Sequence, residues 1–317
     1  MNTHAPHITP LGKFQNRTVT ADGQTRASVT LGRLETLWFN TGTLCNIECV
    51  NCYIESSPTN DALSYISHAE MVDYLDQIDT LDWRVEEIGF TGGEPFMNPH
   101  MIAMAETALS RGYRVLVLTN AMRPMMRKKV QAGLVRLIAK YGQALTFRVS
   151  LDHFTKTKND QIRGKGSFEI ALAGLHWLQA QGASLAIAGR ALWDETPDQS
   201  RKGYAALYGE NDLAIDAENP AQTVLFPEMD ETAEVPEITT SCWGILNKNP
   251  ADIMCASSRM IVKRRGAASP SVVACTLLPY APEFDLGKTL QAAETTVFLN
   301  HRHCAKFCVL GGASCSA

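Results

Sequence analysis

The segment LETLWFNTGTLCNIECVNCY, residues 34–53, joins an apolar run to three closely spaced cysteines. Its first part, Leu34–Asn40, is rich in residues that favour extended structure, which predicts a buried strand. Cys45, Cys49 and Cys52 follow on the loop after that strand. Iron–sulfur clusters are usually held by four cysteines, so three thiolates in one short loop predict a cluster with one iron left without a protein ligand.

The same three thiols are compatible with two other kinds of site. A zinc ion could bind them with a fourth ligand from elsewhere in the chain, such as His68 or His153. A ferredoxin-like cluster that only carries electrons could also use them. The spacing of the cysteines alone does not choose between these hypotheses and a catalytic cluster.

Strand and helix signals alternate along the chain from residue 34 to residue 229. The predicted strands are Leu34–Asn40, Glu87–Thr91, Arg114–Thr119, Leu145–Leu151, Ser184–Ala188 and Thr223–Phe226. Helix signals between them include a capping box at Ser67 and Glu70 and a glycine stop at Gly112. Six such units predict an α/β fold, either a partial barrel or an open doubly wound sheet. In both, ligands bind at the carboxyl ends of the strands.

The segment Thr91–Pro95 reads TGGEP and lies where the second predicted strand ends. Adjacent glycines let the backbone approach a ligand closely. The N–H and C=O groups of Gly92 and Gly93 could therefore pair with the carboxylate and ammonium of an amino acid, and the carboxylate of Glu94 could hold the ammonium. Alone, such a segment is more often a simple turn, but here it shares the predicted active edge with the cysteine loop.

Polar residues also follow the later strands. Ser150 could hydrogen-bond a carboxylate or a ribose hydroxyl, and Arg163 could clamp a carboxylate with two bonds. Taken singly, each is more often part of a solvated loop. Thr119–Asn120 is a weaker candidate. After the fifth strand, Gly189 is interpreted as making room beside a ligand and Arg190 as a surface charge.

A C-x3-C-x2-C loop after the first strand, followed by GGEP after the second, resembles the radical S-adenosylmethionine (SAM) superfamily over roughly residues 34–317. The resemblance implies a partial (β/α)6 TIM-like barrel. It implies that Cys45, Cys49 and Cys52 ligate three irons of a 4Fe–4S cluster, while the methionyl amine and carboxylate of SAM chelate the fourth. The residues that the resemblance assigns to SAM are Gly92, Gly93, Glu94, Pro95, Ser150, Arg163 and Tyr53.

The chain departs from the family pattern at Asn51, because the residue before the third cysteine is usually aromatic and packs near the adenine. Tyr53 is expected to take part of that role. The resemblance further implies that the reduced cluster splits SAM into methionine and a 5′-deoxyadenosyl radical, which abstracts hydrogen from a substrate. The protein would orient SAM, exclude water and oxygen, and accept electrons from a donor such as flavodoxin or ferredoxin. A plain electron carrier or scaffold has no need of the GGEP segment.

The remaining cysteines gather at the other end of the sequence. They are Cys242, Cys255, Cys275, Cys304, Cys308 and Cys315. Residues 255–275 predict a hairpin with a basic turn. A cysteine hairpin before a terminal cysteine cluster resembles the twitch or SPASM appendages of radical SAM enzymes. The resemblance implies one auxiliary 4Fe–4S cluster with ligands from Cys255, Cys275, Cys304, Cys308 and Cys315. Cys242 is interpreted as a core residue, and a structural zinc site is the alternative for the group.

These signals predict an N-terminal polar arm, residues 1–33, a barrel, residues 34–229, and a small cysteine-rich domain, residues 230–317. The formal net charge of −4 gives no basic footprint for nucleic acid. No apolar run is long enough to span a membrane, and no signal peptide is recognised, so a cytoplasmic location is expected. The substrate is open between a small molecule and a peptide presented by another protein. A zinc-stabilised binding module stays the non-enzymatic alternative.

Overall fold

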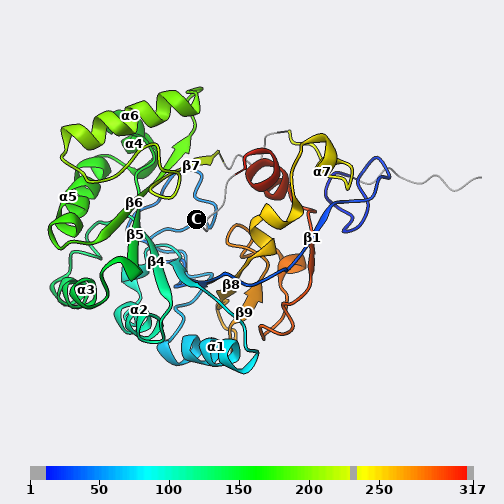
Figure 1. Ribbon diagram of the computed structural model, residues 1–317, viewed down its shortest axis with the longest axis horizontal. Coiled ribbons are helices and arrows are strands. Elements are labelled where there is room, and N and C mark those ends of the chain that lie inside the picture. The colour runs from blue at the N-terminus through cyan, green and yellow to red at the C-terminus, as the bar shows by residue number, and fades with distance from the viewer. Residues whose placement is uncertain (1–11, 229–233, 313–317) are drawn as a thin grey trace, which may run out of the picture.

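The computed structural model describes residues 12–228 and 234–312. Its main sheet has the strand order β7-β6-β5-β4-β3-β2-β8-β9 (Figure 1). Neighbouring strands from β2 to β7 are all parallel. Their bounds are β2 (Thr36–Asn40), β3 (Glu87–Thr91), β4 (Arg114–Thr119), β5 (Leu145–Ser150), β6 (Ser184–Ala191) and β7 (Thr223–Pro227). The predicted α/β partial barrel is therefore confirmed.

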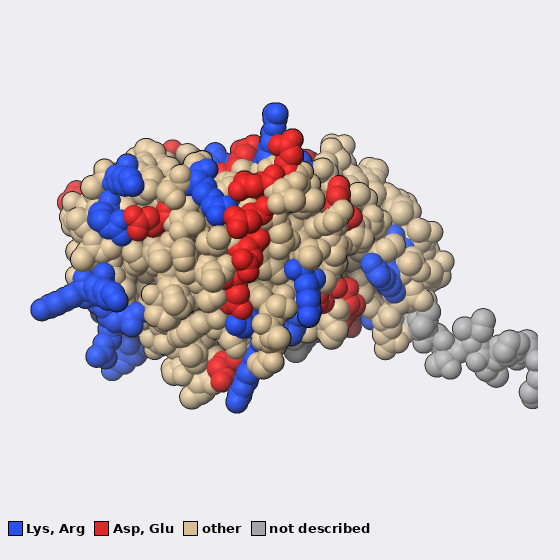
Figure 2. All heavy atoms as spheres, turned by 90° about the horizontal axis from the view of Figure 1, so that it is seen from below, with Lys and Arg blue, Asp and Glu red and all other residues tan. Residues whose placement is uncertain are grey.

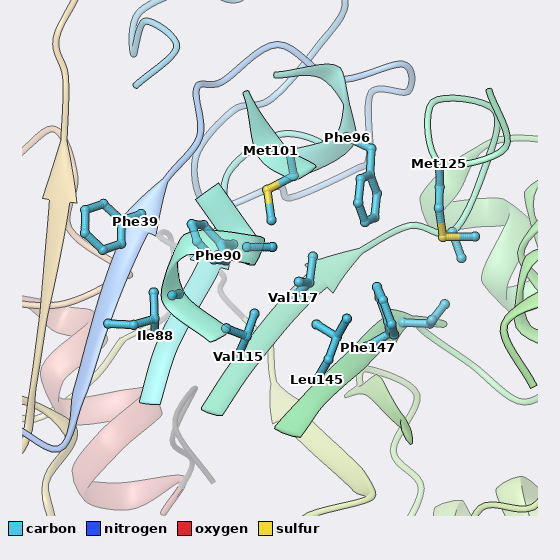
Figure 3. Close-up of a cluster of buried hydrophobic side chains, with 14 of the residues drawn as sticks. Phe39, Ile88, Phe90, Phe96, Met101, Val115, Val117, Met125, Leu145 and Phe147 are labelled. Atoms are coloured by element: carbon cyan, nitrogen blue, oxygen red, sulfur yellow. The ribbon is translucent and has the colours of Figure 1, made fainter. Parts of the chain in front are cut away.

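Helices cover the outer side of this curved sheet (Figure 1). They are α1 (His68–Thr80), α2 (Met101–Ser110), α3 (Lys128–Tyr141), α4 (Lys156–Arg163), α5 (Ser167–Ala180) and α6 (Pro197–Glu210). The predicted capping box at Ser67 and Glu70 opens α1. Phe39, Phe90 and Phe147 lie in the buried layer between sheet and helices (Figure 3). On the helix side charges are interspersed (Figure 2), and Arg111, for example, pairs with Asp76 and Asp79.

The predicted cysteine hairpin is present and extends the barrel's own sheet. Strand β8 (Ser258–Val262) runs parallel to β2, and β9 (Ser271–Val273) pairs antiparallel with β8. Every residue of β8 is buried, as expected for a strand inside a sheet. The predicted barrel and the predicted cysteine-rich domain therefore share one sheet. The sequence did not indicate this, because the alternation of strands and helices stops at residue 229.

The first described residues pack against the last part of the chain. Strand β1 (Ser28–Thr30) pairs antiparallel with β10 (Thr296–Phe298), apart from the main sheet. Arg26 forms an ion pair with Glu237 at 2.5 Å, and both side chains are buried. The described residues of the predicted polar arm thus belong to the folded body.

The shorter helical segments are α7 (Cys242–Ile245), η1 (Pro95–Met97), η2 (Gly142–Ala144), η3 (Pro250–Asp252), η4 (Met254–Ala256), η5 (Pro282–Phe284) and the π-helix η6 (Cys304–Leu310). Strand β8 continues one end of the parallel run, and η6 packs on β7 at the opposite edge of the sheet, where the rings of Phe226 and Phe307 stack at 5.4 Å. The C-terminal segment therefore bridges the two sides of the open barrel. Among the described helices, none has the length and apolarity needed to cross a membrane.

Candidate active site

One cavity lies at the carboxyl ends of the parallel strands. Its lining includes the predicted residues Cys45, Cys49, Cys52, Tyr53, Gly92, Gly93, Ser150 and Arg163. These residues come from separate loops, so the sheet brings together what the sequence keeps apart. The expectation that the strand-end motifs meet at one edge is confirmed by this arrangement.

The cysteine loop is held from several sides. The N–H of Cys45 donates to the carbonyl of Ser57 at 3.0 Å, and the hydroxyl of Tyr280 donates to the carbonyl of Ile54 at 2.8 Å. Asn51 has φ 56°, a left-handed conformation that Asn tolerates and bulky side chains avoid. Asn51 suits this backbone, and Asn51 and Tyr53 both line the cavity, Tyr53 as expected.

The glycine turn packs directly on the cysteine loop. The N–H of Gly93 donates to the carbonyl of Gly42 at 2.8 Å, and that of Glu94 donates to the carbonyl of Leu44 at 3.1 Å. A Cβ at Gly93 would lie 2.2 Å from the Leu44 oxygen, and Gly92 has φ 146°. The Gly93 N–H therefore holds the neighbouring loop, and the contact of Gly92 and Gly93 with SAM stays a prediction.

Glu94 lies behind the cavity wall and is fully buried. Its carboxylate accepts hydrogen bonds from the hydroxyl of Thr119 and the N–H of Asn120, each at 2.8 Å. Burial raises the pKa of this carboxyl to about 7, although those two donors act to lower it. Pro95 begins the helical turn η1 and is buried as well. Glu94 thus ties β3 to the end of β4, and its contact with SAM stays a prediction.

The carboxylate of Asp152, just after β5, joins the guanidinium groups of Arg163, at the end of α4, and Arg190, near the end of β6. Asp152 lies 3.0 Å from Nε of Arg163 and 3.3 Å from Nε of Arg190. Arg190 also donates to the carbonyls of Val50 and Asn51, at 3.3 and 3.4 Å. Arg190 is therefore a clamp on the cysteine loop, and its interpretation as a surface charge is wrong. Arg163 holds a carboxylate of the chain itself, and its contact with SAM stays a prediction.

Two further residues lie differently from expectation. A Cβ at Gly189 would lie 2.2 Å from the hydroxyl oxygen of Tyr204, so this glycine makes room for a core side chain and not for a ligand. That hydroxyl donates to the carbonyl of Leu151 at 2.7 Å. The histidines considered as zinc ligands are engaged elsewhere: Nε2 of His68 bonds Thr107 at 2.7 Å, and Nε2 of His153 bonds Glu195 at 3.0 Å.

The thiols of the loop fit a metal group. Burial raises the pKa of Cys45 to about 12, and it also raises the pKa of Cys49, which Arg163 offsets in part. Free thiols in this place would stay protonated. A bound cation deprotonates a coordinating thiol outright, so the donor set suits an iron–sulfur cluster better than a free nucleophile.

A second, smaller cavity lies under the C-terminal segment. The thiols that line it are Cys255, Cys275, Cys304 and Cys308, all of them buried. Burial raises the pKa of Cys304 well above its usual value, and the charges of Cys275 and Cys255 add to the effect. Within residues 12–228 and 234–312, no three His, Cys, Asp or Glu side chains are grouped as they would be around a single metal ion.

Cys242 is not among the residues that line this cavity. Cys315 lies outside the described residues. Cys242 is half-buried, and its sulfur lies 3.4 Å from both the backbone nitrogen and the hydroxyl of Thr239. The two cavities share Leu277 in their linings, and Phe307, on the same helix as Cys304, lines the first.

Fold and site together define an α/β barrel protein with three cysteine thiols lining a cavity at its open strand ends. Residues 39–189 match the model of the radical SAM superfamily, so this part of the chain is a radical SAM domain.

Relatives and solved structures agree with this assignment. The bacteriocin subtilosin biosynthesis protein AlbA of Bacillus subtilis is 31% identical over 145 residues, 45% of this chain and 30% of AlbA. Fe-coproporphyrin III synthase of Methanosarcina barkeri is 32% identical over 149 residues, 45% of this chain and 33% of that protein. The chain therefore matches about a third of the length of either relative.

Among solved structures, SuiB of Streptococcus suis bound to S-adenosylmethionine has a TM-score of 0.56 with this chain. The match covers 80% of this chain and 63% of SuiB at 12% identity. Identity this low shows a shared fold.

Proposed function

We propose that this protein cleaves S-adenosylmethionine reductively and uses the resulting radical to abstract hydrogen from a substrate. The observation that carries the proposal is the convergence of Cys45, Cys49 and Cys52 with the glycine turn in one cavity. A protein that only stores or passes electrons has no need of such a cavity beside its cysteines. The zinc hypothesis is weakened because His68 and His153 bond to Thr107 and Glu195.

The chain's own residues bind and orient the reactants. When bound, a 4Fe–4S cluster supplies the electron that divides SAM into methionine and a 5′-deoxyadenosyl radical. Cys45, Cys49 and Cys52 would hold that cluster, and Ser150, Arg163 and Tyr53 would position SAM in the lined space. Arg190 fixes the position of the cysteine loop by donating hydrogen bonds to two of its backbone carbonyls. Apolar side chains such as Phe307 keep water from the reacting atoms.

The C-terminal thiols would hold one auxiliary 4Fe–4S cluster, in a part of the chain that resembles a twitch or SPASM appendage. Four buried thiols around one small cavity support this proposal. The substrate would be a peptide presented by a separate protein. AlbA is named for bacteriocin biosynthesis, and SuiB has been solved with its precursor peptide SuiA. The name of Fe-coproporphyrin III synthase keeps a small molecule as the second candidate. Flavodoxin or ferredoxin would supply electrons, and a cytoplasmic location is expected.

The test is production of 5′-deoxyadenosine by protein purified without oxygen, on addition of SAM and dithionite. The unaltered protein should be brown and should release 5′-deoxyadenosine, and Cys45→Ala should release none. Cys242→Ala is the matched control and should retain cleavage, because its thiol lies outside both cavities. Brown protein that never yields 5′-deoxyadenosine would favour the electron carrier, and colourless zinc protein would favour the binding module.

A further inference from the structure

The side chain of Asn120 lies between the end of β4 and the cysteine loop. Its Nδ2 is 3.8 Å from the sulfur of Cys45 and 2.9 Å from Oδ1 of Asn46. Its Oδ1 accepts the N–H of Met122 at 3.0 Å. Its own backbone N–H donates to Glu94. Asn120 is only 5% exposed, so these partners, and not water, define its surroundings.

The orientation of the Asn120 amide is fixed from its other end. An amide oxygen and an amide nitrogen are assigned by their partners, and a backbone N–H such as that of Met122 can be met only by the oxygen. The nitrogen must therefore face the cysteine loop. Its two hydrogens match the two acceptors there, the oxygen of Asn46 and the sulfur of Cys45.

The sulfur of Cys45 depends on donors from the protein. Cys45 is 5% exposed, whereas Cys49 and Cys52 are partly accessible to solvent. The backbone N–H of Ile47 also donates to this sulfur. Asn120 is thus the side chain through which a substitution can change the hydrogen bonding of this thiolate.

We propose that Asn120 is a positioning residue that donates a hydrogen bond to the Cys45 thiolate and raises the reduction potential of the cluster bound there. Reduction adds negative charge to the cluster and its sulfur ligands. A donor aimed at a sulfur stabilises that charge, and hydrogen bonds to sulfur are among the factors that set cluster potentials. The inference rests on the proposed function, because it requires a cluster on Cys45.

The test is a redox titration of the reconstituted full-length protein, followed by electron paramagnetic resonance at the signal that changes when SAM is added. Asn120→Ala should shift the midpoint of that signal to a more negative potential. Asn120→Leu has nearly the same shape, adds no charge and lacks the amide donor, so it should shift the midpoint in the same direction. This second variant replaces Asn120→Ala in the titration if the alanine variant does not retain iron.

Asn46→Ala is the matched control. It removes the other acceptor of the Asn120 amide and leaves the donor to Cys45, so the midpoint should not become more negative. An unchanged midpoint in both Asn120 variants would overturn the inference, and so would an equal shift in Asn46→Ala, which would point to loop tethering. If the unaltered protein shows no SAM-responsive cluster signal, the proposed function itself fails.

Discussion

Glu94 places an ionisable carboxyl group where water cannot reach it. The side chain is fully buried, and burial raises its pKa to about 7 from an ordinary value of 4.5. Because the folded-state pKa lies above the unfolded one, the fold prefers the protonated carboxyl. This contribution to stability is complete below pH 4.5 and is lost as the pH rises towards about 7.

Glu94→Gln should remove that pH dependence. As the pH rises from 5 to 8, the unaltered protein should lose stability relative to the variant. The difference between their free energies of unfolding should change by up to about 3 kcal/mol, because a shift of one pKa unit corresponds to 1.36 kcal/mol. Urea unfolding of metal-free protein, without SAM, measures the difference. Glu106→Gln is the control, since Glu106 is partly exposed and its ion pair with Arg136 lowers its pKa from 4.5, away from this range. Parallel pH profiles for Glu94→Gln and the unaltered protein would contradict the assignment.

The sequence identifies single residues of the site better than their partners. Cys45, Tyr53 and Ser150 lie in the predicted cavity, because residues at the ends of parallel strands share one edge. The pairing of Asp152 with Arg190 could not be foreseen, since it depends on how closely two strand ends and the cysteine loop approach. The only signal in the sequence was that both residues lie close to the carboxyl end of a strand.

At the scale of elements, strand bounds were predictable and strand neighbours were not. Parallel strands covered on both faces appear as continuous apolar runs, so β3 and β4 match their predicted bounds. The order of strands in a sheet cannot be deduced from their order along the chain. For that reason the place of β8 beside β2 emerges only from the structure.

The close packing of the glycine turn on the cysteine loop gives an element-scale prediction. Gly93→Ala would set a Cβ 2.2 Å from a backbone oxygen of Leu44, which neither loop can avoid without moving. The expected cost is about 2 kcal/mol or more in stability, together with loss of bound iron. Thermal unfolding and iron analysis of the same preparation measure both effects.

Gly209→Ala is the matched substitution. Gly209 lies in α6, and an added Cβ there would have no atom within 4 Å, so alanine should stabilise the helix by about 0.5–1 kcal/mol. Opposite signs for the two substitutions are expected. A Gly93→Ala protein as stable and as iron-rich as the unaltered one would show that the two loops are not in contact.

At the scale of the whole molecule, the N-terminal segment around Arg26 packs against the C-terminal part of the chain. Arg26 is completely buried, pairs with Glu237, and also donates to the carbonyls of Val19 and Leu299. Removing one partner of a buried ion pair leaves the other charge without compensation, which costs about 3–5 kcal/mol.

Arg26→Met should therefore lower the free energy of unfolding by about 3 kcal/mol in urea titrations. Lys13→Met removes the neighbouring pair with Glu234, whose side chains are 51% and 89% exposed, and should cost far less because water screens the pair. Equal effects of the two substitutions would mean that the N-terminal segment is not docked as described.

The last prediction concerns the four thiols that three distant segments bring to one cavity. Cys255 lies on η4, Cys275 follows β9, and Cys304 and Cys308 lie on η6. Sequence spacing could suggest this group but could not show which cysteines meet, because the meeting depends on β8 and η6 reaching opposite edges of the sheet. Cys242, close in sequence to Cys255, stays outside the cavity.

Cys255→Ala should lower the iron content from about eight to about four atoms per chain, since each 4Fe–4S cluster holds four. The SAM-responsive signal should persist, because Cys255 does not line the first cavity. Cys242→Ala should retain all the iron. Iron and zinc analysis of the two variants, prepared side by side, decides the matter. Loss of iron from Cys242→Ala, or zinc in place of the missing iron, would refute an auxiliary cluster held by the four buried thiols.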